Sequence, residues 1–287
     1  MRRSLVAICF LLSAGCTAVP EPTATTMPAP TRASPTPSAT QTPPPPPTAT
    51  GQACLSLPGQ VIVDEYIDSD LPRSIPYRVY LPPCYEEDAS RPYPVLVLLH
   101  GLQLSDSQWD DLGIDETADA LIRRAAIPPV VIVMPWERRG LDFEQAIVAK
   151  LLPHIRSTSA GGGDRTTTAI GGISRGAGWA LRIGLKHPDE FGAIGLHSPA
   201  VLSPDLYYLG DWIKAAEPMG VPRLWIDFAD RDTSRASALE LAMALEEFGA
   251  TFASSSAPGE HTGTYWSSRL EDYLTWYASG WAGSLMR

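Results

Sequence analysis

Several features that mark large protein classes are missing from this sequence. No basic tract interrupts a chain of 287 residues whose formal net charge is −10, so we do not expect a nucleic-acid partner. After residue 12, no stretch approaches the roughly 20 apolar residues that a membrane-spanning helix needs. No internal repeat is visible. DNA-binding proteins, polytopic membrane proteins, collagens and coiled coils are therefore excluded.

The first 16 residues have the order of a bacterial export signal. The positively charged Arg2 and Arg3 are followed by the apolar residues 5–12 and then by Ser13-Ala14-Gly15-Cys16. This resembles the lipobox of bacterial lipoproteins, which implies removal of residues 1–15 and lipidation of Cys16. The protein would then be anchored to the outer face of a membrane by its lipid alone. An ordinary secretory signal is the alternative, and in both cases the leader is not part of the fold.

Cysteine is scarce, with four residues in the whole chain. Cys9 lies in the leader and Cys16 is the lipidation candidate, so Cys54 and Cys84 remain. An isolated pair in an exported protein is typical of a disulfide, and two free thiols are the alternative. Neither cysteine has a second metal ligand nearby in the sequence, so we expect no metal site there.

Proline is distributed unevenly and divides the chain. Residues 17–53 hold 11 of the 28 prolines and almost no charge. Such a segment cannot bury enough apolar surface to offset its ordering entropy, so we expect an extended stalk. We therefore expect a signal peptide at residues 1–15, the lipidated cysteine and linker at residues 16–53, and one domain at residues 54–287.

That domain alternates predicted strands with predicted helices. Residues 61–67 and 77–81 alternate apolar and polar side chains, whereas residues 94–99 and 130–134 are continuous apolar runs typical of strands covered on both faces. Further strands are predicted at residues 168–173, 193–196 and 224–228, and helices at residues 114–126, 143–155, 176–186, 205–217, 234–248 and 264–277. This order predicts an α/β fold whose central sheet is mostly parallel, with helices on both faces.

A nucleophilic serine is indicated at one strand–turn–helix segment. Gly172-Ile173-Ser174-Arg175-Gly176 follows an apolar strand and precedes a helix-compatible run. The pattern G-x-S-x-G in this context is typical of a nucleophile elbow, in which glycines allow close backbone packing around a strained serine. A glycine-rich turn with a capping serine is the alternative interpretation.

A serine nucleophile needs a base and an acid that orients the base. Among five histidines, His261 lies in a glycine-flanked loop between a strand and the last helix, from which it can reach Ser174. The acid is expected just after the strand at residues 224–228. Asp232 is preferred because a short turn lets its carboxylate face back, and Asp230 remains the alternative. Asp227, within the strand, is interpreted as structural.

The oxyanion of a serine mechanism needs two backbone donors. The N–H of Arg175 follows the candidate nucleophile, and the N–H of Leu102 follows His100-Gly101 at the end of an apolar strand. We expect these two groups to form the oxyanion hole. Side-chain donors are not excluded by the sequence.

With these residues in place, the domain resembles the α/β-hydrolases. It is most similar to the esterase group that includes esterase D, feruloyl and acetylxylan esterases, enterochelin esterases and mycolyl-transferring relatives. The resemblance covers residues 59–277 and rests on Arg78-Val79-Tyr80-Leu81-Pro82-Pro83, Val97-Leu98-Leu99-His100-Gly101, Ala169-Ile170-Gly171-Gly172-Ile173-Ser174-Arg175-Gly176 and Pro258-Gly259-Glu260-His261. It implies Ser174 as nucleophile, His261 as general base and Asp232 as the acid, with no metal or organic cofactor. The family often has glycine where Ala229 stands, which leaves the acid less secure.

The sequence leads to the hypothesis of a tethered serine carboxylesterase that acts on exported or cell-envelope esters. The short interval between the strands at residues 193–196 and 224–228 predicts an open cleft without a large lid. Candidates for lining the cleft are the aromatic residues Trp109, Trp136, Tyr265 and Trp266, with core packing as the alternative. Acyl transfer to a sugar or lipid acceptor, and a non-catalytic envelope-binding module, are the alternative functions.

Overall fold

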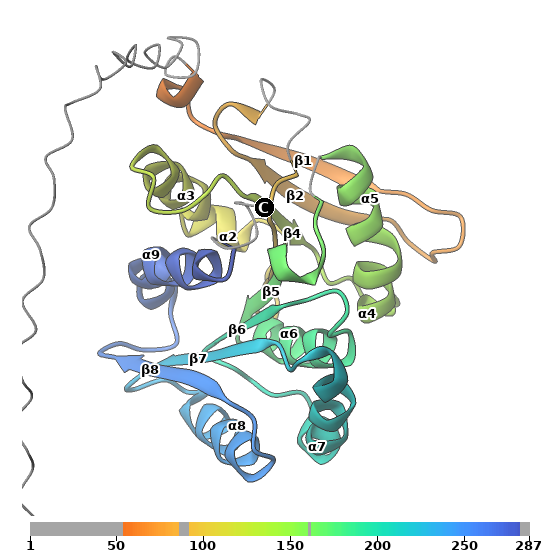
Figure 1. Cartoon of the computed structure of the whole chain (residues 1–287), viewed down its shortest axis with the longest axis vertical. Helices are drawn as coiled ribbons and strands as arrows, with labels where there is room; N and C mark the ends of the chain where they lie inside the picture. Colours follow the sequence, from red (N-terminus) through yellow and green to blue (C-terminus); the bar gives the residue numbers. More distant parts are fainter. Residues whose placement is uncertain (1–53, 86–91, 160–161, 282–287) are drawn as a thin grey trace, which may run out of the picture. The chain divides into compact units, whose positions relative to one another are not determined.

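A computed structural model of the chain describes residues 54–85, 92–159 and 162–281 (Figure 1). These residues belong to one compact unit, Pro46–Arg287. The signal peptide, the lipidation candidate Cys16 and the Pro/Thr-rich linker lie outside the described residues. Within the described ranges, no helix is both long enough and apolar enough to span a bilayer.

The described part of the chain forms one mixed sheet of eight strands. The strands are β1 (Gln60–Tyr66), β2 (Ile75–Leu81), β3 (Val95–Leu99), β4 (Val131–Pro135), β5 (Thr168–Ile173), β6 (Ala193–His197), β7 (Arg223–Ala229) and β8 (Phe252–Ala257). Their order across the sheet is β1-β2-β4-β3-β5-β6-β7-β8. The pairings of β2 with β1 and β4 are antiparallel, and all the other pairings are parallel. The predicted fold class is confirmed.

Helices cover both faces of this sheet (Figure 1). They are α2 (Gln108–Asp111), α3 (Ile114–Arg123), α4 (Phe143–Gln145), α5 (Leu152–Thr158), α6 (Arg175–Lys186), α7 (Asp205–Ala216), α8 (Arg235–Glu247) and α9 (Gly263–Ser279). Shorter helical segments are η1 (Cys54–Ser56), η3 (Ala146–Leu151), η4 (Arg165–Thr167) and η5 (Glu217–Met219). The buried side chains of α2, α3 and α9 share one core, and those of α4 to α8 share the other. The connection between β6 and β7 holds α7 and η5.

The central strand β3 shows how the sheet separates these two cores. Val95, Val97 and Leu99 pack in the core on the α6 side, whereas Leu96 and Leu98 pack in the core on the α9 side. Successive side chains of a strand point to opposite faces, so a strand covered on both faces must be apolar throughout. The sequence of β3 is continuously apolar because both faces of the strand are buried.

The helix expected at residues 143–155 is interrupted in the structure. It is divided into α4, the π-helical segment η3 and α5. Pro153 has no N–H to donate to the carbonyl of Ala149, and its ring would crowd that carbonyl in a regular α-helix. A wider π-helical turn before the proline accommodates this missing bond.

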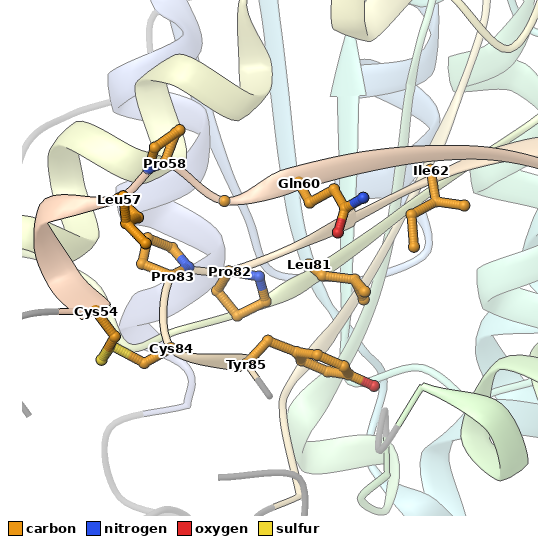
Figure 2. A pocket seen from close by; sticks show the side chains of 11 residues that line it. Cys54, Leu57, Pro58, Gln60, Ile62, Leu81, Pro82, Pro83, Cys84 and Tyr85 are labelled. Carbon is orange, nitrogen blue, oxygen red and sulfur yellow. A yellow bond between two sulfur atoms is a disulfide. The ribbon is translucent and has the colours of Figure 1, made fainter. Parts of the chain in front are cut away.

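Cys54 and Cys84 form a disulfide, with their Cα atoms 5.0 Å apart. The bond joins η1 to the residues that follow β2, and it borders a pocket of about 380 Å³ (Figure 2). The pocket is lined mainly by apolar and proline side chains, among them Pro58, Pro83 and Tyr85. It lies at the β1–β2 edge of the sheet.

Removing the disulfide is expected to lower the free energy of unfolding by about 3.5 kcal/mol in the chain-entropy model, because the bond closes a long loop. The two cysteines are 30 residues apart in the sequence. Urea unfolding of the double variant Cys54→Ser/Cys84→Ser measures this loss. Reduced wild type should match the variant, and a reductant should leave the variant unchanged. A loss below about 1 kcal/mol would contradict the loop-closure account.

Candidate active site

Ser174 lies on the sharp turn between β5 and α6. Its backbone angles, φ 55° and ψ −117°, are in a region that residues other than glycine rarely adopt. The turn is held because the N–H of Ser174 donates to the carbonyl of His197 at 2.9 Å. A Cβ at Gly172 would lie 2.3 Å from the backbone of Gly176, and one at Gly176 would lie 2.3 Å from the backbone of β3. Both glycines of the motif are therefore needed for the elbow to pack.

Asp232 follows β7, His261 follows β8, and the two side chains meet. His261 Nδ1 and Asp232 Oδ1 are 2.7 Å apart, and the N–H of Ser234 donates to the same oxygen at 2.7 Å. Burial raises the pKa of Asp232, but the interactions of its carboxylate with His261, Ser198 and the Ser234 N–H outweigh burial and hold the pKa below its ordinary value. An ionised carboxylate only accepts, so His261 carries its proton on Nδ1. Its Nε2 is then free to accept a proton.

Asp230 has a different role in the same loop. Its Oδ1 accepts from the N–H of Gly259 at 2.9 Å, and Arg231 lies 3.9 Å from that oxygen. The side chain is exposed. The structure thus places Asp232, rather than Asp230, against His261.

Ser174, Asp232 and His261 all lie at one edge of the sheet. β5, β6, β7 and β8 are parallel, so the loops that follow them share the carboxyl edge. The order Ser, Asp, His along the chain is the order of α/β-hydrolase triads. Ser174 Oγ has no hydrogen bond to any described residue. In free enzymes the bond between nucleophile and base often becomes short only with substrate in place.

The two expected oxyanion donors flank the elbow. Arg175 is the first residue of α6, so its N–H has no acceptor within the helix. Leu102 follows Gly101, where a Cβ would lie 3.8 Å from the Cβ of Ser174. The N–H of Gly101 donates to Gln108 Oε1 at 2.7 Å. Gln108, on α2, therefore fixes the loop that carries Leu102.

Glu137 connects the oxyanion loop to the elbow helix. Its carboxylate accepts two hydrogen bonds from Arg175, at 2.9 and 2.6 Å, and its N–H donates to His100 Nε2 at 2.8 Å. Burial lowers the pKa of His100, whose Nδ1 lies 2.7 Å from the Gly101 carbonyl. His100 is thus a neutral structural group with its proton on Nδ1. Sequence reasoning missed Glu137 and Gln108, because neither stands in a recognisable motif.

Three of the four expected cleft aromatics, Trp109, Tyr265 and Trp266, belong to the core, which corrects that expectation. Trp109 and Tyr265 are 1% and 3% exposed. The indole N–H of Trp109 donates to the carbonyl of Leu99 at 3.1 Å, and the hydroxyl of Tyr265 donates to Asp227 at 2.7 Å. Their polar atoms are satisfied by these interior partners, so both rings can be buried at the inner side of the site.

Trp266 and Trp136 border the site in different ways. Trp266 is 6% exposed, and its ring meets His261 edge-on with centroids 4.9 Å apart. Its indole N–H donates to Ser198 Oγ at 2.9 Å. Trp136 is 37% exposed and lines a cavity of about 680 Å³ together with Leu102 and Arg175. Trp266 thus supports the imidazole, and Trp136 lies where a substrate can touch it.

Asp227 is a fully buried carboxylate behind the site. It accepts hydrogen bonds from the hydroxyls of Tyr265 and Tyr273 at 2.7 and 2.8 Å, and His197 Nδ1 lies 3.2 Å away. His197 also supplies the carbonyl that holds Ser174. Among the described residues, no group of three His, Cys, Asp or Glu side chains could hold a metal ion. The structural interpretation of Asp227 agrees with these contacts.

Replacing Asp227 with alanine is expected to lower the free energy of unfolding by about 3 kcal/mol, because buried hydroxyls lose their acceptor. Denaturant unfolding of Asp227→Ala measures the loss. Asp230→Ala is the matched control, since Asp230 is exposed and lies in the loop directly after β7. Equal stability of the two variants would refute a supporting role for Asp227.

Comparison with known proteins places the chain among esterases. A family model described as "Esterase: Putative esterase" matches residues 69–277. The endo-1,4-beta-xylanase/feruloyl esterase of Xylanibacter ruminicola is 25% identical over 170 residues, which cover 54% of this chain and 22% of that protein. A second curated relative, from Corynebacterium glutamicum, is 32% identical over 127 residues, which cover 40% of this chain and 30% of the relative. The chain thus spans less than a third of the length of both relatives.

Solved structures share the fold. A ferulic acid esterase has a TM-score of 0.70 and 23% identity, covering 78% of this chain and 99% of that chain. An S-formylglutathione hydrolase from Staphylococcus aureus has a TM-score of 0.66 and 18% identity, covering 77% and 96%. These similarities show the α/β-hydrolase fold.

Proposed function

The chain belongs to the esterase family whose model matches residues 69–277, a family of carboxylesterase-type serine hydrolases, and on this premise we propose that it cleaves carboxylic esters through an acyl-enzyme intermediate. One observation carries the assignment of residues. His261 is held by an ionised Asp232, and Ser174 lies on a strained elbow at the same carboxyl edge of the sheet. This combination of acid, base and nucleophile is the arrangement that serine acyl transfer requires.

In the proposed mechanism, Ser174 Oγ attacks the ester carbonyl carbon while His261 Nε2 takes its proton. Asp232 keeps the imidazole in the reactive tautomer and stabilises the imidazolium. The N–H groups of Leu102 and Arg175 donate to the oxyanion. The carbon–oxygen bond then breaks, and the alcohol leaves with the proton from His261. Water, activated by His261, releases the acid and restores Ser174.

An acyl-enzyme at Ser174 is the decisive experimental test. Mixing the protein with excess p-nitrophenyl acetate should give a burst of nitrophenol, because acylation precedes slower deacylation. Peptide mapping of acid-quenched enzyme by mass spectrometry should find the acetyl group on Ser174. Turnover without any acyl group on Ser174 would refute the mechanism, and absence of turnover on a panel of acyl esters would refute the function.

We propose further that the enzyme is exported and held at a membrane by a lipid on Cys16, so that its substrates are exported or cell-envelope esters. The leader residues and the Cys54–Cys84 disulfide support this, since disulfides persist mainly in oxidising compartments. Mass spectrometry of the mature N-terminus tests it. A diacylglyceryl group on Cys16 is expected, and an unmodified N-terminus beyond Cys16 would overturn the anchor.

A further inference from the structure

A cavity of about 680 Å³ beside the elbow is strongly basic. Four arginines line it, Arg73, Arg138, Arg139 and Arg175, and Glu137 is its only carboxylate among the described residues. We call this cavity the arginine pocket. The whole chain carries a formal net charge of −10, so this concentration of positive charge opposes the overall balance.

Three of the four guanidinium groups have no anionic partner among the described residues. Glu137 pairs with Arg175 through two hydrogen bonds. Within the described ranges, no carboxylate forms an ion pair with Arg73, Arg138 or Arg139. The pocket therefore keeps a charge of about +3 after its internal pair is counted, since His100 is neutral there.

The arginines come from two loops that the sheet brings together. Arg138 and Arg139 lie in the loop that follows β4 at the carboxyl edge. Arg73 lies two residues before β2, whose Tyr77 pairs with Pro135 at the end of β4. Arg73 Nε also lies 3.7 Å from the position that a Cβ on Gly140 would occupy. Two separate loops thus supply guanidinium groups to one cavity.

An aromatic ring and the oxyanion donors complete the lining. Arg138 lies over the ring of Trp136, with the guanidinium carbon 5.4 Å from the centroid, which limits the freedom of its side chain. Leu102 and Arg175, whose N–H groups are the expected oxyanion donors, line the same cavity. An anionic group bound in the arginine pocket and an ester carbonyl at Ser174 could therefore belong to one substrate molecule.

We propose that the arginine pocket binds a carboxylate or phosphate on the ester substrate, so that the enzyme prefers anionic esters. The proposal rests on the esterase function and names its substrate class. Guanidinium groups bind such oxyanions through paired, charge-assisted hydrogen bonds, and a basic cavity also attracts them over distance. The anionic group can belong to the acyl part or to the alcohol part of the ester.

Matched esters test the preference on both sides of the scissile bond. On the acyl side, 4-nitrophenyl hemisuccinate is compared with neutral 4-nitrophenyl levulinate, and on the alcohol side 4-acetoxybenzoate is compared with 4-acetoxybenzamide. In at least one pair, kcat/KM is expected to be about tenfold higher for the anionic ester, a typical effect of one hydrogen bond to a charged group. Added salt should reduce the preference.

The variant Arg73→Gln/Arg139→Gln removes two unpaired charges without touching the candidate triad or oxyanion donors. In this variant, the ratio of kcat/KM for the anionic ester to that for the neutral ester should fall about tenfold, and the rate on the neutral esters should stay unchanged. The control Arg124→Gln/Lys214→Gln removes two exposed charges, one directly after α3 and one on α7, and should keep the preference. No preference in either pair, or the same preference in both variants, overturns the proposal.

Binding separates this proposal from the esterase function itself. Calorimetry with N-(4-nitrophenyl)succinamic acid and with 4-acetamidobenzoate, the amide analogues of the two anionic esters, needs no turnover. Wild type should bind at least one of them about tenfold more tightly than Arg73→Gln/Arg139→Gln. Equal affinity of the two proteins for both analogues would refute the anionic site even in an active esterase. Tighter binding by wild type, without hydrolysis of any ester, would instead keep the site and refute the esterase function.

Discussion

Replacing Ser174 with alanine is expected to lower kcat for p-nitrophenyl acetate by about 10⁴- to 10⁶-fold, because the acyl-enzyme can no longer form. The loss should appear in kcat rather than in KM, since the hydroxyl acts in the transition state and contributes little to ground-state binding. Steady-state kinetics on the purified variant measure it. Labelling by a fluorophosphonate, which modifies activated serines, should vanish in the same variant.

Ser256→Ala is the control for that experiment. Ser256 is an exposed serine on β8, and its hydroxyl has no place in the proposed mechanism. Its rate and its fluorophosphonate labelling should match those of wild type. Full activity in Ser174→Ala would remove the serine from the mechanism. Loss of labelling in both variants would point to damage of the fold rather than to chemistry.

Asp232→Asn is expected to lower kcat by about 10³- to 10⁴-fold while leaving the fold intact. The carboxylate can only accept, whereas an asparagine amide can also donate to the imidazole. A donating amide favours the tautomer with the proton on Nε2, which cannot take the proton of Ser174. The pH dependence of kcat/KM, measured beside kcat at one pH, checks that the loss persists wherever wild type is active.

Asp230→Asn is the matched control for Asp232→Asn, because the two aspartates are two positions apart in one loop. Asp230 Oδ1 accepts from the Gly259 N–H, a bond that an asparagine oxygen can keep. Activity should therefore stay within about twofold of wild type. The reverse outcome, with Asp230→Asn inactive and Asp232→Asn active, would exchange the proposed roles of the two residues.

The buried part of the fold was predictable because its physical causes are visible in the sequence. Continuous apolar runs become β3 and β4, since parallel strands are covered on both faces. The polar strand β8, Phe-Ala-Ser-Ser-Ser-Ala, carries no such signal because it lies at the edge and is partly exposed. The apolar spacing of residues 143–155 predicts one continuous helix and does not show the π-helical turn that accommodates Pro153.

The sequence predicted the candidate catalytic residues but not the residues that position them. Ser174 and His261 stand in motifs with a strand before them, so their positions could be inferred from local sequence. The choice between Asp230 and Asp232 depends on which carboxylate faces β8, and only the folded loop determines this. Glu137 acts through contacts with residues 37 and 38 positions away, and Gln108 acts through a contact with the backbone of a loop. No local pattern marks such contacts.

The Cys54–Cys84 disulfide also determines how the domain carries mechanical load. A force applied to the chain N-terminal to Cys54 is transmitted to the disulfide bond before it is transmitted to β1. The force then passes to Cys84, just after β2, and bypasses the edge pairing of β1 with β2. Edge strands separate easily when pulled in sequence, one hydrogen bond at a time. A domain tethered through its N-terminus would thus resist peeling as long as this bond stays oxidised.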